Sequence, residues 1–269
     1  MKKLLLIIAF FGVMSAESSL MKQGFYFSIG HSTSYFNFNE FDKTNNDAFI
    51  MRMDTLAVGV NAGVGFVGAS FKAELNIDSN IGGGLYTGGD YYTGARKRSY
   101  DFHSFHHADV ILGYNVLRSF ERVSLYLQSG VSYLFSRNES STLERVQGYL
   151  SIPFGLEGQV KLGETWSFDY MGRYNLFLLG HHISRGNGYG MNGDLNTLQK
   201  TGWGAKAMIG FSRVNKDSKI TSYHLVYEYF YKDDSPAANL FSYVTGVPSN
   251  PREPRSTQHI FTFEYTWRF

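Results

Sequence analysis

Cysteine is missing from this sequence, and proline occurs only five times in 269 residues. Without cysteine there is neither a disulfide framework nor a lipid-modified residue behind a leader segment. The 25 lysines and arginines nearly balance the 23 aspartates and glutamates, and no basic stripe marks a nucleic-acid-binding surface. After the amino-terminal segment, no apolar run approaches the ~20 residues of a transmembrane helix. The sequence therefore argues against a disulfide-stapled protein, a nucleic-acid-binding protein and a helical membrane protein.

The amino terminus has the layout of a secretory signal peptide. Two lysines precede a short apolar run, Leu4–Val13, and small residues follow it. The run is too short to anchor the chain as a membrane helix. Cleavage after Ala16 and cleavage after Ser18 are both compatible with the pattern. We take 1–18 as the signal peptide and, because no linker interrupts the remainder, 19–269 as one domain.

The remainder is rich in aromatic residues (17%) and glycine (29 residues), and its apolar residues recur at every second position. Such alternation indicates strands with one apolar and one polar face. Ten segments show it: 25–29, 56–60, 71–78, 108–114, 123–135, 146–161, 166–178, 203–211, 223–231 and 258–269. Short connections alternate with longer polar or Gly-rich ones, of which the longest lie near 79–97, 180–196 and 232–255.

This pattern predicts an all-β fold: a transmembrane antiparallel up-and-down β-barrel of about ten strands, with short periplasmic turns and longer extracellular loops. An even strand number places both termini on the periplasmic side. The competing interpretation is a secreted soluble β-sandwich. In the barrel, the apolar face meets lipid and the polar face encloses the lumen. The charged residues expected to face inward and to pair across the lumen carry both signs: Lys72, Glu74, Asp78, Glu157, Lys161, Asp169, Arg173, Lys206, Glu228, Glu264 and Arg268.

The last segment, QHIFTFEYTWRF, ends on Phe269 and carries aromatic residues on one face. It resembles the carboxy-terminal recognition strand of bacterial outer-membrane β-barrel proteins. That resemblance implies docking of the strand, through Phe269, to the barrel-assembly machinery. It also implies that the protein resides in the outer membrane of a Gram-negative cell.

Ten strands enclose a narrow lumen, since about eight leave room only for side chains and 16–18 form a water channel. We therefore expect a surface-exposed scaffold or adhesive protein, or a narrow porin-like one, in contact with outer-membrane lipids and lipopolysaccharide. Whether the protein is an enzyme stays open. No cofactor or metal is expected, because the Gly-rich stretches 82–89 and 186–193 lack the Lys-Ser/Thr ending of a phosphate loop.

An enzymatic alternative comes from the stretch GHHISRGNGYGMNGDLN. Its His182 and Ser184 share one strand face, as a histidine-activated serine nucleophile requires, and their parity with Trp166 predicts that they face outward. The stretch resembles the His-x-Ser motif of outer-membrane phospholipase A and lipid A 3-O-deacylase. That resemblance implies a lipid esterase with His182 as base, Ser184 as nucleophile and Asn196 as the orienting residue. Arg185 departs from both families, which carry Asn at that position.

A second polar group lies on one predicted strand and comprises Asp101, His103, His107 and Asp109. Carboxylates and histidines high in a ten-stranded barrel are similar to those of the omptin proteases, but their acidic pairs on opposing walls are not matched here. Three converging metal ligands are not expected either, because one strand would spread His103 and His107 ~13 Å apart. We interpret these residues as polar groups paired near the rim.

Overall fold

The computed structural model describes residues 23–89, 95–139, 144–185 and 190–269; the predicted signal peptide, 1–18, lies outside them. Nearly all of the described chain is β-structure. The elements are β1 (Gly24–Asp42), η1 (Lys43–Asn45), β2 (Ala48–Val67), β3 (Phe71–Gly89), β4 (Arg96–Asn115), β5 (Val123–Glu139), β6 (Glu144–Lys161), β7 (Trp166–Ser184), β8 (Leu195–Gln199), β9 (Gly202–Val214), β10 (Ile220–Lys232), β11 (Leu240–Ser242), β12 (Val247–Ser249) and β13 (Arg255–Arg268). Within the described residues, no helix has the length and apolar character to cross a membrane.

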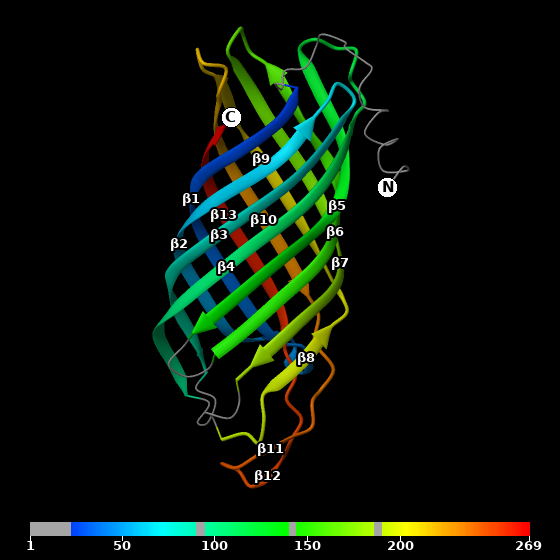
Figure 1. Cartoon of the computed structure of the whole chain (residues 1–269). Coiled ribbons are helices and arrows are strands. Elements are labelled where there is room, and N and C mark those ends of the chain that lie inside the picture. The colour runs from blue at the N-terminus through cyan, green and yellow to red at the C-terminus, as the bar shows by residue number, and fades with distance from the viewer. Residues whose placement is uncertain (1–22, 90–94, 140–143, 186–189) are drawn as a thin grey trace, which may run out of the picture.

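Ten strands form a closed antiparallel barrel (Figure 1). The hydrogen-bonded order is β6-β5-β4-β3-β2-β1-β13-β10-β9-β7, and pairing of β6 with β7 closes the ring. The short strand β8 extends the wall beside the end of β7, and β11 pairs only with β12. The predicted all-β barrel of about ten strands is therefore confirmed.

The carboxy-terminal strand completes the wall between β1 and β10. Its backbone pairs with β1 from Ser28 opposite Arg268 to Phe41 opposite Arg255, and the Phe269 amide donates to the Phe27 carbonyl at 2.8 Å. Because this strand supplies both ladders between β1 and β10, the barrel is closed only when β13 is in place.

The outer surface of the wall is apolar, as the alternation predicts. On β2, Leu56, Val58 and Val60 are 69%, 63% and 61% exposed, while Thr55 and Ala57, on either side of Leu56, face inward and are buried. Exposed apolar area on this scale belongs against hydrocarbon, since a soluble monomer rarely displays contiguous apolar patches of more than a few hundred Å². The wall is thus built to face lipid.

The two ends of the barrel differ (Figure 1). Short turns, together with the start of β1 and the end of β13, lie at one end, called here the turn end; η1, β8, β11 and β12 lie at the other, the loop end. Part of the loop predicted over 79–97 is strand, because β3 continues to Gly89 and pairs there with Arg96. Glycine has no side chain, so the alternation of polar and apolar residues could not reveal this part of the strand. At position 82 glycine is required, because a Cβ there would collide with the backbone of Leu56 and Ala57.

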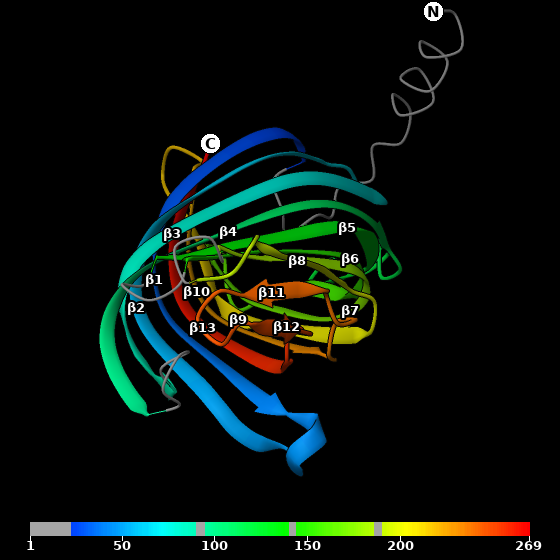
Figure 2. The ribbon, with the colours of Figure 1, turned by 90° about the horizontal axis from the view of Figure 1, so that it is seen from below.

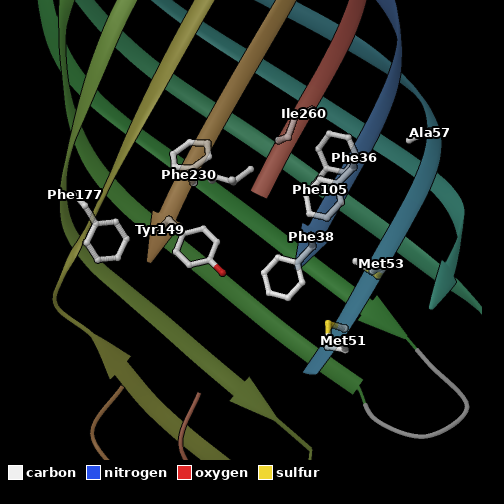
Figure 3. Packing of buried hydrophobic residues seen from close by; sticks show 11 residues of the cluster. Phe36, Phe38, Met51, Met53, Ala57, Phe105, Tyr149, Phe177, Phe230 and Ile260 are labelled. Atoms are coloured by element: carbon white, nitrogen blue, oxygen red, sulfur yellow. The ribbon is translucent and has the colours of Figure 1, made fainter. Parts of the chain in front are cut away.

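The lumen is filled in layers. Buried apolar side chains from most strands meet in its loop-end half and form what we call the apolar layer (Figure 3). Its members are Phe36, Phe38, Met51, Met53, Ala57, Phe105, Leu134, Tyr149, Phe177, Phe230 and Ile260. The turn-end half contains charged side chains instead. Inward-facing aromatic residues were not predicted, because the sequence interpretation assigned apolar residues to the lipid-facing side.

Candidate functional site

A β-bulge reverses the faces of β7 near its loop end. Leu150 pairs with Leu179, but the next residue, Ser151, pairs with Phe177, so Leu178 is an extra residue in β7. Leu178 and Leu179 both face outward, at 43% and 38% exposure. Beyond the bulge the alternation is shifted by one residue.

Because of this bulge, the predicted outward orientation of His182 and Ser184 is wrong. Both side chains point into the lumen, where His182 is 0% and Ser184 7% exposed. Their predicted proximity is real: His182 Nε2 lies 2.7 Å from Ser184 Oγ. The pair therefore lies inside the barrel and not against the acyl chains of lipid.

Asn196 does not join this pair. It lies on β8 opposite Ile183 and is exposed on the outer face, while Thr197 takes the inward position opposite His182. The predicted orienting residue is therefore on the wrong side of the wall. A different acid is present, because Glu253 Oε2 lies 2.8 Å from His182 Nε2. Nothing in the sequence near the His-x-Ser stretch indicated Glu253, which belongs to a loop far along the chain.

Gln147 completes a cluster with His182, Ser184 and Glu253, called here the His182 cluster. It determines which nitrogen of the His182 imidazole carries the proton. Its amide nitrogen lies 3.0 Å from Glu253 Oε1 and 3.0 Å from His182 Nδ1. An amide nitrogen donates in both contacts, so Nδ1 accepts and the proton that reaches Ser184 and Glu253 is carried on Nε2. In this arrangement Nε2 is a donor, and it is not free to take the proton of the serine hydroxyl.

Glu253 reaches the lumen from a loop that folds over the barrel mouth. We call residues 233–254, between β10 and β13, the cap. The Glu253 amide donates to Ser235 Oγ at 2.8 Å, and the Ser235 amide donates to the Glu253 carbonyl at 2.9 Å. Burial raises the pKa of the Glu253 carboxyl, but its contact with His182 and the nearby charge of Arg145 outweigh this and lower the pKa below its usual value.

The cap also contacts the connection between β7 and β8. The Phe241 amide donates to Asn192 Oδ1 at 2.8 Å, and the Tyr243 amide donates to the Gly190 carbonyl at 2.7 Å. Seen from the loop end, β11 and β12 lie across the barrel mouth (Figure 2). Two loops thus cover the His182 cluster together.

Further buried charges surround this cluster. Arg145 Nη1 lies 2.5 Å from Glu40 Oε1. Lys232 is fully buried, donates to Gln258 at 3.2 Å and has its ammonium 3.6 Å from the centre of the Tyr149 ring. A cation over an aromatic face is stabilised when water is excluded. The loop end of the lumen is therefore a buried polar cluster next to the apolar layer.

The turn-end half of the lumen contains the ion pairs that the sequence predicted. Lys72 Nζ lies 2.8 Å from Glu74 and 2.7 Å from Glu157, and Arg173 lies 3.3 Å from Asp109 and 3.4 Å from Glu157. The prediction that inward charges of both signs pair across the lumen is confirmed for these strands. Lys161 departs from it, because it is exposed at the very end of β6.

The polar group on β4 does not assemble into one site. Asp101 accepts a hydrogen bond from Ser99, and His103 lies within the apolar layer, 2.9 Å from Ser136 Oγ. His107 and Asp109 belong to the ion-pair network farther toward the turn end. Among the residues that the structure describes, no three His, Cys, Asp or Glu side chains converge as metal ligands.

Comparison with known proteins shows similarity in structure only. No family model matches the sequence, and no curated protein matches it. The outer membrane protease OmpT from Escherichia coli is similar over 96% of this chain and 98% of its own, with a TM-score of 0.68 and 7% identity. The outer membrane protein OprG from Pseudomonas aeruginosa is similar over 92% and 97%, with a TM-score of 0.41 and 10% identity. The chain therefore has the fold of the outer-membrane β-barrels.

Proposed function

We propose that this outer-membrane barrel is a surface-exposed protein that acts through its loops, with a lumen closed to solutes. The apolar layer is the observation that carries the proposal. Its aromatic and methionine side chains fill the loop-end half of a narrow barrel, and hydrophobic constrictions block ions by excluding water. In a barrel of this fold the turn end faces the periplasm and the loop end faces the outside.

The cap offers the most prominent contact surface. Around the β11–β12 hairpin, Tyr243, Val244 and Val247 are 68%, 57% and 53% exposed. These apolar side chains lie at the loop end, far from the lipid-facing band, so lipid does not cover them. An adhesive role for the hairpin follows from this placement.

Planar-bilayer recordings of the purified barrel test the closed lumen. We expect no steady conductance from the wild-type protein. A variant with Phe36→Ser and Phe230→Ser in the apolar layer should conduct if the layer is the barrier. Steady conductance of the wild type would contradict the proposal.

The adhesive role has its own test. Cells that display the wild-type barrel should adhere to a protein-coated surface better than cells that display Tyr243→Ser with Val244→Ser. The control variant carries Asn192→Ser instead, which weakens a polar loop contact and leaves the apolar tip in place. Equal adherence of wild-type and tip-variant cells would remove the hairpin from consideration.

A lipid hydrolase remains the second candidate, supported by the 2.7 Å contact between His182 and Ser184 and by the carboxylate of Glu253 beside them. For this activity the cap would have to open and the proton on His182 Nε2 would have to move. The test is fatty-acid release from phospholipid and lipopolysaccharide by wild type and by Ser184→Ala. Equal release by both would eliminate the serine as nucleophile.

The apolar wall and the closing strand β13 support two further proposals about partners. We propose that the apolar wall contacts outer-membrane lipids and lipopolysaccharide, and that Phe269 on the closing strand docks to the barrel-assembly machinery. Deletion of Phe269 should lower the amount of barrel in the outer membrane, as measured in membrane fractions of expressing cells. The variant Phe269→Tyr, which keeps an aromatic ring at this position, should reach the wild-type amount.

A further inference from the structure

The loop-end part of β4 has a neighbouring strand on one side only. β4 pairs with β3 along its whole length, up to Arg96 opposite Gly89, but its pairing with β5 stops at Phe102 opposite Glu139. Of the residues that the structure describes, none pairs with 96–101 on the β5 side. We call this stretch the free edge. At ~3.3 Å per residue it is ~20 Å long, the length of an ordinary strand.

The backbone of the free edge directs polar groups to the open side at every second residue. At the other end of β4, the Asn115 amide donates to the Ser70 carbonyl on the β3 side, and the Val116 amide donates to the Leu125 carbonyl on β5. Neither ladder of β4 has a register shift, so its even-numbered residues direct their N–H and C=O groups toward β5 throughout. At the free edge these residues are Arg96, Arg98 and Tyr100. A row of unpaired backbone groups is a template for another strand.

The side chains of the same three residues suit an acidic partner. Arg96 and Arg98 are exposed, and Tyr100 is 89% exposed. No described residue forms an ion pair with either arginine, and Glu139 at the end of β5 is already paired with Arg137 at 2.7 Å. The positive charge of the free edge is therefore not neutralised by the described chain. The other arginines at the loop end each have a carboxylate partner: Arg52, Arg137, Arg145, Arg185, Arg252 and Arg255.

The free edge lies outside the lipid-facing band. From Tyr114 at the turn end to Tyr100, β4 rises ~35 Å at ~3.3 Å per residue and ~40° tilt, whereas the apolar band of such a barrel is only ~25 Å tall. Lipid therefore does not cover Tyr100. A second copy of the same edge does not suit it either, because the arginines of the two copies would repel each other.

We propose that the free edge binds an extended acidic segment of an extracellular protein, which adds to the barrel wall as a strand beside β4. The backbone of the segment would pair with Arg96, Arg98 and Tyr100, and its carboxylates would accept hydrogen bonds from the two guanidinium groups. A sulfated polysaccharide could use the arginines but would leave the backbone groups unpaired, so a polypeptide fits better. This surface is separate from the β11–β12 hairpin and rests on the proposed function only in that the loop end faces the outside.

Fluorescence anisotropy with the full-length barrel in detergent tests the proposal. The probe is a short fluorescent peptide that alternates glutamate and valine, and we expect saturable binding. The variant Arg96→Gln with Arg98→Gln should bind it at least about tenfold more weakly, because both charge-assisted contacts are lost. The matched control, Arg118→Gln with Arg122→Gln, removes two exposed charges beyond the other end of β4 and should bind within about twofold of wild type.

Strand addition has its own readout in the backbone. The same peptide with an N-methyl group on every residue keeps its charges but donates no backbone hydrogen bond, so it should bind at least about tenfold more weakly. On the barrel, Arg98→Pro should weaken binding more than Arg98→Gln does. Both variants lose the charge, but only proline also removes an N–H that points to the open side, and an edge position tolerates proline.

Four results would overturn the proposal: no saturable binding of the peptide, unchanged affinity in the Arg96→Gln, Arg98→Gln variant, equal binding of the N-methylated peptide, or equally tight binding of a heparin fragment. Circular dichroism of each variant shows whether the barrel is folded, and Arg98→Gln alone replaces the double variant if that one does not fold. The hairpin variant Tyr243→Ser with Val244→Ser should bind the peptide like wild type. Failure of this surface and failure of the adhesive hairpin are therefore distinguishable.

Discussion

Replacement of Lys72 by methionine tests whether the ion pairs in the turn-end half of the lumen are shielded from water. The Lys72 side chain is 0% exposed, and its ammonium lies 2.8 Å from Glu74 and 2.7 Å from Glu157, which are only 8% and 13% exposed. Methionine keeps most of the volume of the side chain but removes the charge. Glu157 then keeps Arg173, at 3.4 Å, and Glu74 keeps the Tyr26 hydroxyl at 2.7 Å.

The expected loss in the free energy of unfolding is large, because the buried carboxylates of Glu74 and Glu157 lose their cation. Removing one partner from a buried ion pair typically destabilises a protein by ~3–5 kcal/mol. Lys43 provides the matched control: its ammonium lies 2.9 Å from Asp233, but its side chain is 51% exposed. An exposed pair of this kind contributes little to stability, because water screens it. Lys72→Met with Glu157→Gln should recover part of the loss, since one uncompensated charge is then gone.

Equilibrium urea unfolding in lipid vesicles, followed by the fluorescence of the three tryptophans, measures both free energies of unfolding. The free energy of unfolding of Lys72→Met should be clearly lower than that of Lys43→Met. If the two variants lose the same small amount, water screens the charges around Lys72, and the ion pairs of the turn-end half are not shielded.

Three further predictions concern the wall, the bulge and the cap. Gly82→Ala should lower the free energy of unfolding by ~1–3 kcal/mol in the same urea assay, whereas Gly83→Ala, with no atom within 4 Å of its added Cβ, should be nearly neutral. The chain has no native cysteine, so Ile183→Cys should react with a lipid-soluble maleimide and His182→Cys should not; the reverse would refute the bulge. The pKa of Glu253 is lowered in the folded state, so its contribution to stability is complete above an ordinary carboxyl pKa and is lost as pH falls below about 4. Proteolysis of the cap should therefore accelerate in acid for wild type, and Glu253→Gln should show no such pH dependence.

The alternation in the sequence was sufficient to predict the barrel. On 71–78, every second residue is charged or polar, and in the structure Lys72 and Glu74 indeed pair inside the lumen while Leu75 and Ile77 are exposed on the wall. One rule, apolar out and polar in, was enough for the regular strands. The rule holds because lipid touches one face of each strand and a narrow interior touches the other.

The same rule could not reveal the inside of the loop-end half. Phe36 and Phe38 are apolar and face inward, and Tyr35, next to Phe36 on the opposite face, breaks the alternation on β1. A run of aromatic residues on both faces was the available signal for a filled lumen. Inward-facing residues of a narrow barrel can be apolar where they pack against one another and fill the lumen.

The inward orientation of His182 and Ser184 and the place of Asn196 could not be predicted, for two local reasons that parity and spacing do not express. Leu178 is a single unpaired residue, and the backbone change that it causes leaves no mark in the composition of the strand. Glu253 reaches His182 only because the cap folds back over the mouth, so its role depends on tertiary structure and not on distance along the chain. Asn196, chosen for its spacing from Ser184, consequently lies on the opposite face.

The extra residue in β7 has a consequence for how this protein can change over generations. Loss of the codon for Leu178 would remove the bulge but leave His182 and Ser184 facing inward, because Phe177 and Leu179 would then follow each other in regular alternation. The bulge is therefore a point at which β7 can lose one residue, in a single genetic step, without exchanging its membrane-facing and lumen-facing side chains.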